Sequence, residues 1–229
     1  MSPLRPRAPI AADALLPGDP ARALHLAQEL LAEPKMSNHA HGLWGYGGRS
    51  GDGLELTIQS TGIGGPSAAL VLAELASHGV RRAIQLGTCS AIDPALKLGE
   101  VVLVREAISA DGTSRELSGD PALEPDPELG AALAGAAGEA GARSVTVASS
   151  DLAGPLDSKR GEEWARRGAA GVEMSAAALL AAGRRCGVAV ASLLAVADRG
   201  GRTIADQALL EASARMGEIA LAALSSTSR

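Results

Sequence analysis

Short apolar runs alternate along the chain with longer stretches in which apolar and small residues recur at helical spacing. The apolar runs rich in β-branched residues predict strands at residues 14–16, 54–60, 83–86, 100–104, 144–148 and 188–196. The helical spacing predicts helices at residues 20–32, 66–77, 126–140, 159–167, 174–185 and 205–224. This alternation predicts an α/β fold in which helices cover both faces of a parallel or mixed sheet.

The segments between these elements are rich in glycine, proline, serine and aspartate, which favour turns. The clearest are residues 47–53 and residues 111–127. The second is long enough that we expect it to be either functional or mobile. Because no internal repeat or shift in composition divides the chain, we expect one domain over residues 1–229, with residues 1–12 as an extended N-terminal segment.

Composition excludes several classes of protein. With 46% hydrophobic and 21% charged residues in 229, the chain is globular rather than disordered. The chain has no phenylalanine, and its other aromatic residues are Trp44, Tyr46 and Trp164, so few side chains could stack on nucleic-acid bases. A net charge of −5 also disfavours binding to a phosphate backbone, and we expect no nucleic-acid partner.

The cysteines and histidines do not form a metal-binding pattern. Cys89 and Cys186 are far apart, and the histidines at positions 25, 39, 41 and 78 lack the spacing of metal ligands. We therefore expect no metal and no disulfide, which suits a reducing cytoplasm. The sequence also lacks an apolar run long enough for a signal peptide or a membrane span, so we expect a cytoplasmic protein without a membrane partner.

Two glycine-containing turns could hold a ligand. In PGDPAR (residues 17–22) a strand leads into a helix whose free N–H groups and nearby Arg22 could bind an anion, although a capped turn with a solvated arginine has the same pattern. In STGIGGPS (residues 60–67) three glycines permit close approach of a ligand, or they serve only the packing of a tight turn. Neither turn is a dinucleotide-binding fingerprint or a P-loop.

Three further motifs place polar residues at strand ends. LGTCSA (residues 86–91) brings Thr88 and Ser90 to a place where α/β sheets bind ligands, while Cys89 has no recognisable base and fits a buried thiol. Glu173 in VEMS could accept sugar hydroxyls or occupy the N-terminus of a helix. Asp198 in VADR is a candidate general acid, or a loop anchor paired with a neighbouring arginine.

The order and spacing of PGDPAR, STGIGGPS, LGTCSA, VASSD, VEM and VADR resemble the family of hexameric purine nucleoside phosphorylases and uridine phosphorylases. The resemblance runs from about residue 15 to residue 224, and STGIGGPS with ASSD leans toward the uridine branch. It implies one α/β domain around a mixed, partly barrel-like sheet, and a homohexamer built as a trimer of dimers. It also implies phosphorolysis of a nucleoside, with inorganic phosphate as cosubstrate and no other cofactor.

The resemblance also assigns roles to residues. Asp198 falls on the acid that assists the leaving base in the purine enzymes, and Arg199 resembles an arginine of the uridine enzymes. The phosphate-binding positions are Gly18, Arg22, Gln85, Thr88 and, from a neighbouring subunit, His41. The nucleoside-binding positions are Ile63, Cys89, Ser90, Ala153, Glu173, Met174, Ser175 and Arg199.

Several of these positions depart from the family pattern. Gln85 and His41 stand where the family has phosphate-binding arginines, and each lost charge-assisted hydrogen bond is worth roughly 1.5 to 3 kcal/mol. Ser175 replaces a second glutamate that binds the sugar, and Ala153 replaces an aromatic residue in the base pocket. The residues that read uracil align approximately with Asp157 and Lys159.

These departures leave three functions open. A phosphorylase is favoured because Arg22, Thr88 and Asp198 persist and a protonated His41 could supply charge. A nucleosidase that uses water would account for the missing arginines. A weakly active or inactive nucleoside-binding protein would account for the other replacements.

Overall fold

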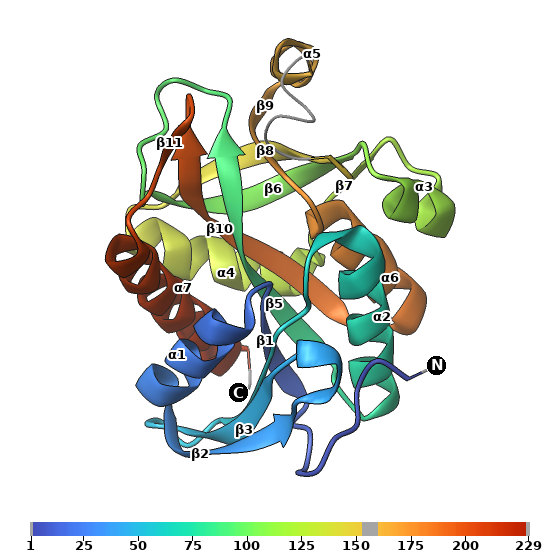
Figure 1. Ribbon diagram of the computed structural model, residues 1–229, viewed down its shortest axis with the longest axis vertical. Coiled ribbons are helices and arrows are strands. Elements are labelled where there is room, and N and C mark those ends of the chain that lie inside the picture. The colour runs from blue at the N-terminus through green and yellow to red at the C-terminus, as the bar shows by residue number, and fades with distance from the viewer. Residues whose placement is uncertain (1, 153–159, 228–229) are drawn as a thin grey trace.

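A mixed β-sheet runs through the centre of the protein (Figure 1). The structure, a computed structural model, describes residues 2–152 and 160–227. The strands in these residues are β1 (Asp13–Pro17), β2 (Leu31–Asn38), β3 (Gly45–Ser50), β4 (Glu55–Gln59), β5 (Arg82–Ala91), β6 (Val101–Ser109), β7 (Ala122–Leu123), β8 (Arg143–Ser149), β9 (Ala169–Glu173), β10 (Ala189–Arg199) and β11 (Arg202–Thr203).

Part of the sheet closes on itself. The strand order is β11-β10-β6-β8-β9-β5-β1-β4-β3-β2, and β10 also pairs with β5 over its whole length. The strands β10, β6, β8, β9 and β5 therefore form a closed ring, from which β1, β4, β3 and β2 extend as an open sheet. The predicted α/β fold with a mixed, partly barrel-like sheet is confirmed.

Helices cover the sheet on two sides (Figure 1). They are α1 (Pro20–Leu30), α2 (Gly64–Ser77), α3 (Gly112–Ser118), α4 (Pro127–Glu139), α5 (Gly161–Arg166), α6 (Ala176–Cys186) and α7 (Asp206–Ser226), with a 3-10 turn η1 at Ala40–Gly42. One core cluster lies between the sheet and helices α2 and α6, and a second lies under α1, α4 and α7. Both are built almost entirely from Ala, Leu, Val and Ile, as a chain so poor in aromatic residues requires.

Some predicted boundaries were wrong. The helix expected at residues 20–32 ends at Leu30, and the chain turns at once into strand β2. The segment expected to be a loop at residues 47–53 contains most of strand β3, in which Gly48 packs closely against Leu31 and Ala32 of β2. The expected loop at residues 111–127 folds into helix α3 and strand β7, because Asp111 caps α3 through the Ser114 amide.

Residues 2–12 contain no helix or strand, although Leu4 is buried against the α2 and α6 core. No helix in the described part of the chain is both long and apolar enough to cross a membrane. Strands β1, β5 and β10 run parallel to one another, so their carboxyl ends meet at one edge of the sheet.

Candidate active site

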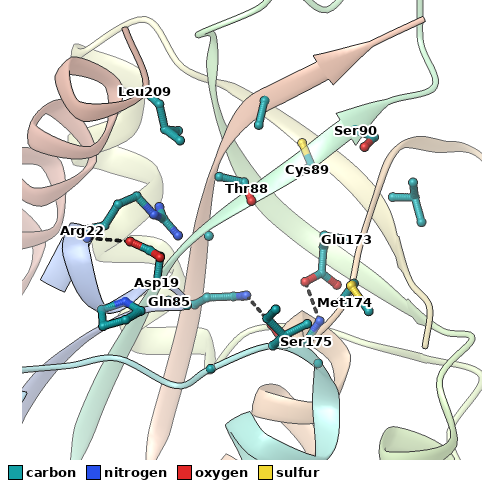
Figure 2. A pocket seen from close by; sticks show the side chains of 18 of the residues that line it. Asp19, Arg22, Gln85, Thr88, Cys89, Ser90, Glu173, Met174, Ser175 and Leu209 are labelled. Atoms are coloured by element: carbon teal, nitrogen blue, oxygen red, sulfur yellow. Dashed lines mark hydrogen bonds between the residues drawn. The ribbon is translucent and has the colours of Figure 1, made fainter. Parts of the chain in front are cut away.

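A cavity of about 590 Å³ opens at this edge of the sheet. Its walls come from the carboxyl ends of β1, β5, β9 and β10, the turn between β4 and α2, and the first turns of α1 and α7. The structure brings together ten of the residues that the sequence singled out: Gly18, Arg22, Ile63, Gln85, Thr88, Cys89, Ser90, Glu173, Met174 and Ser175 (Figure 2).

Arg22 forms a buried positive charge at one end of the cavity. Asp19 caps helix α1 by accepting a hydrogen bond from the Arg22 amide at 2.8 Å, which fixes the first turn. The Arg22 side chain is 6% exposed and donates Nη1 to the Leu86 carbonyl at 3.0 Å. Among the residues that the structure describes, it has no ion-pair partner.

Two opposing effects act on the pKa of this group. Burial lowers the pKa of the Arg22 guanidinium, and the negative charge of Asp19 partly offsets that effect. A guanidinium keeps its proton in proteins, so the charge remains, and the nearby Asp19 carboxylate forms no ion pair with it. Such a group favours an anionic ligand in the cavity.

The strand β5 supplies the middle of the cavity. Thr88 and Ser90 present hydroxyl groups to the cavity. Position 87 has no room for a side chain, because a Cβ on Gly87 would lie 2.5 Å from the Leu194 side chain. Cys89 is 4% exposed, and burial together with the negative charge of Glu173 raises the pKa of its thiol to about 12. The thiol is therefore protonated at neutral pH, so Cys89 contributes to the wall of the cavity and does not act as a nucleophile.

Glu173 lies at the junction of β9 and α6. Its Oε2 accepts hydrogen bonds from the amides of Ser175 at 2.7 Å and Ala176 at 2.9 Å, and its Oε1 accepts one from the Ser149 hydroxyl. Burial raises the pKa of Glu173, whereas these hydrogen bonds and the Gln85 amide act in the opposite direction. Of the two roles left open by the sequence, the carboxylate clearly fills the one at the helix N-terminus.

Gln85 connects the two ends of the cavity. Its side chain is 4% exposed, and its Nε2 donates to the Ser175 hydroxyl at 3.0 Å (Figure 2). The amide thus joins β5 to the start of α6 without adding charge. Arg22 is the only cationic side chain among the described residues that line the cavity.

Three predicted residues do not line the cavity of their own chain. Asp198 is half-buried, because β10 bulges after Val196 and then runs toward solvent, but its Cα pairs with that of Ser90. Arg199 is exposed and donates Nη2 to the Pro94 carbonyl at 2.8 Å. His41 is exposed in turn η1, with the left-handed φ of 56°.

The remaining positions lie outside the described residues. These are Ala153, Asp157 and Lys159.

Sequence reasoning missed several residues of the cavity wall. Leu209 enters from the first turn of α7, and Leu152 and Val172 add apolar surface. Single aliphatic residues of this kind have no sequence signal, because nothing distinguishes them from core positions before the fold is known. Ser149, whose hydroxyl donates to Oε1 of Glu173, lies within the VASSD motif, but the sequence assigned no role to it.

Comparison with known proteins identifies the family to which the chain belongs. The family model of the phosphorylase superfamily matches residues 13–227. The chain is 32% identical to a DeoD-type purine nucleoside phosphorylase of Clostridium novyi over 194 residues, which cover 82% of this chain and 83% of that protein. Similar enzymes of Clostridium beijerinckii (31%, covering 84% and 83%) and Alkaliphilus metalliredigens (32%, covering 86% and 88%) carry the same name. The chain therefore belongs to the phosphorylase superfamily.

Proposed function

We propose that this protein cleaves the N-glycosidic bond of a nucleoside with inorganic phosphate, giving the free base and a pentose 1-phosphate. The observation that carries the proposal is the buried guanidinium of Arg22, which forms no ion pair with any described residue and lies at the end of a cavity large enough for a nucleoside. A buried charge of this kind is costly unless an anion pairs with it. Phosphate is such an anion, and membership of the phosphorylase superfamily supports the choice.

Phosphate would lie between α1 and β5. Arg22 and the Thr88 hydroxyl can both donate to its oxygens, and the backbone of Gly18 lies beside them. Phosphate in this position faces the sugar from below, opposite the departing base. Because positive charge grows on the sugar as the bond breaks, an anion held there stabilises the transition state.

The nucleoside would fill the rest of the cavity. Met174 and Ser175, at the start of α6, face the sugar, and Glu173 holds them there. Ser90, Cys89 and Ile63 contact the base or the sugar. No aromatic side chain lines the cavity in the described part of the chain, so the base would be held by aliphatic and sulfur contacts rather than by stacking.

The leaving base requires a proton donor. We propose Asp198, whose strand position is beside Ser90 and whose neighbour Ala197 lines the cavity. An acid there would protonate N7 of a purine as the glycosidic bond breaks. The names of the relatives from Clostridium and Alkaliphilus also favour a purine base.

The site would be completed in an assembly. His41 is exposed on turn η1 and does not line the cavity of its own chain, which suits donation to the phosphate of a neighbouring subunit. A homohexamer built from dimers, with His41 exchanged across each dimer, is the arrangement we propose.

Hydrolysis is the second candidate, and one observation favours it. Gln85 occupies the cavity as a neutral amide bonded to Ser175, so Arg22 alone supplies positive charge among the described lining residues. A site with one cation binds phosphate less tightly than a site with three, and water could replace it.

The experiment is base release from a panel of inosine, adenosine, guanosine, uridine, thymidine and methylthioadenosine, each with and without phosphate, followed by chromatography. Release that requires phosphate supports phosphorolysis and identifies the base. Release at the same rate without phosphate would replace the proposal with hydrolysis. Release from no nucleoside would leave a binding protein.

A further inference from the structure

One buried hydroxyl joins three elements next to the cavity, through its hydrogen bonds to Glu173 and Ala177. Ser149 is the last residue of β8 and is fully buried. Its Oγ donates to Oε1 of Glu173 on β9 and accepts a hydrogen bond from the Ala177 amide on α6 at 2.8 Å. The backbones are also joined, because the Ser150 amide donates to the Glu173 carbonyl at 2.8 Å.

The acceptor capacity of Glu173 is largely used within the protein. A carboxylate has about four lone-pair sites. Three are occupied by the Ser149 hydroxyl and the amides of Ser175 and Ala176, and the Gln85 amide lies close enough to interact as well. Glu173 therefore has little capacity left for the hydroxyls of a ligand. It instead fixes the first turn of α6.

The carboxylate of Glu173 also determines where the next two residues lie. Met174 and Ser175 line the cavity between Glu173 and the first turn of α6, so their position depends on how that carboxylate is held. Ser149 holds Oε1 and the Ala177 amide at the same time, which fixes the carboxylate and the helix relative to each other. Side chains that contact a ligand must themselves be held in place by neighbouring hydrogen bonds, because a shift of about 1 Å can lower the reaction rate 10²-fold.

We infer that Ser149 is a positioning residue, which acts through Glu173 to place Met174 and Ser175 against the sugar of the substrate. The inference rests on the proposed function, because it assumes that the sugar occupies this part of the cavity. Ser149 itself is fully buried and is not one of the residues that line the cavity.

The chain offers a matched control. Ser109 ends the neighbouring strand β6, is in register with Ser149 and is 4% exposed. Its hydroxyl has no hydrogen-bond partner among the described residues. Ser109→Ala therefore removes a buried hydroxyl of the same kind at the same strand position without disturbing Glu173.

The test is a double-mutant cycle of Ser149→Ala and Glu173→Gln, with steady-state kinetics on the best nucleoside of the panel and thermal unfolding of each variant. We expect Ser149→Ala to raise KM for the nucleoside about tenfold while kcat stays within about threefold, because loosened sugar contacts act on the ground and transition states alike. We expect Ser109→Ala to leave both constants unchanged. In the Glu173→Gln background, Ser149→Ala should raise KM by less than about twofold, since its route is already broken.

The outcomes distinguish failure of the positioning role of Ser149 from failure of the proposed function. If wild-type protein releases no base, the proposed function fails whatever the variants do. If wild-type protein is active but Ser149→Ala matches Ser109→Ala in KM, or if the two effects multiply in the double variant, the positioning role is overturned. Ser149→Thr, which keeps the hydroxyl, is the second variant should alanine prevent folding: KM within about threefold of wild type supports the inference, and a tenfold rise overturns it.

Discussion

Replacing Arg22 with methionine separates the function of the site from the stability of the fold. Nη1 of Arg22 already donates to the Leu86 carbonyl, which leaves its other N–H groups for phosphate. Two charge-assisted hydrogen bonds at about 1.5 to 3 kcal/mol each amount to about 3 to 6 kcal/mol. At about 1.4 kcal/mol per factor of ten, Arg22→Met should raise KM for phosphate by about 10²- to 10⁴-fold.

The same change should cost little stability. Methionine keeps much of the length of the side chain. It also removes a buried charge that has no ion-pair partner among the described residues and whose desolvation opposes folding. The lost hydrogen bond to Leu86 offsets part of this gain, so the free energy of unfolding should change by no more than about 1 kcal/mol.

The assay is initial-rate kinetics at varied phosphate, with denaturant unfolding of the same samples. Arg49→Met is the control, because Arg49 lies on the surface in an ion pair with Glu55 and both side chains are 65% exposed. It should change neither quantity measurably. A KM for phosphate within threefold of wild type in Arg22→Met would refute the reasoning, as would unfolding of that variant.

Cys89, Asp198 and Gly183 each allow a separate test. Iodoacetamide at neutral pH should modify the exposed Cys186 and leave Cys89 intact, because burial raises the pKa of the Cys89 thiol to about 12. Mass spectrometry after digestion measures the labelling of each cysteine, and equal labelling in the native protein would contradict the prediction. Asp198→Ala should lower kcat for a purine nucleoside by about 10²- to 10⁴-fold, and turnover within threefold of wild type would remove Asp198 from the mechanism. Gly183→Ala should lower the free energy of unfolding by about 1 to 3 kcal/mol, because the new Cβ would lie 2.5 Å from Val190 Cγ2. An unchanged denaturant midpoint would contradict this prediction and show that the contact between α6 and β10 relaxes around the methyl group.

The parts of the fold that hydrophobic pattern and turn residues determine locally could be predicted from the sequence. Asp126 and Pro127 mark the start of α4 as expected, because the Asp126 side chain accepts from the amides that follow. Strand β2 could not be predicted, since five of its eight residues are exposed and it includes Pro34. Its pairing with β3, rather than its own pattern, makes it a strand.

The candidate active site could likewise be predicted only in part from the sequence. Motifs at the strand ends indicated Arg22, Thr88 and Glu173, because parallel strands bring their carboxyl ends to one edge. The hydrogen bonds from Ser149 to Glu173 and from Gln85 to Ser175 join residues 24 and 90 positions apart. Such contacts depend on sheet register, which a single sequence does not reveal.

Phosphorus NMR of a reaction mixture tests the central claim most directly. Inosine, or the nucleoside that the panel identifies, is incubated with inorganic phosphate, and the phosphorus spectrum is followed while free base is measured in the same tube. Phosphorolysis predicts a pentose 1-phosphate signal that grows in equal amount to the base, with inorganic phosphate falling to match. Free base without any sugar phosphate would contradict the account and make water the nucleophile.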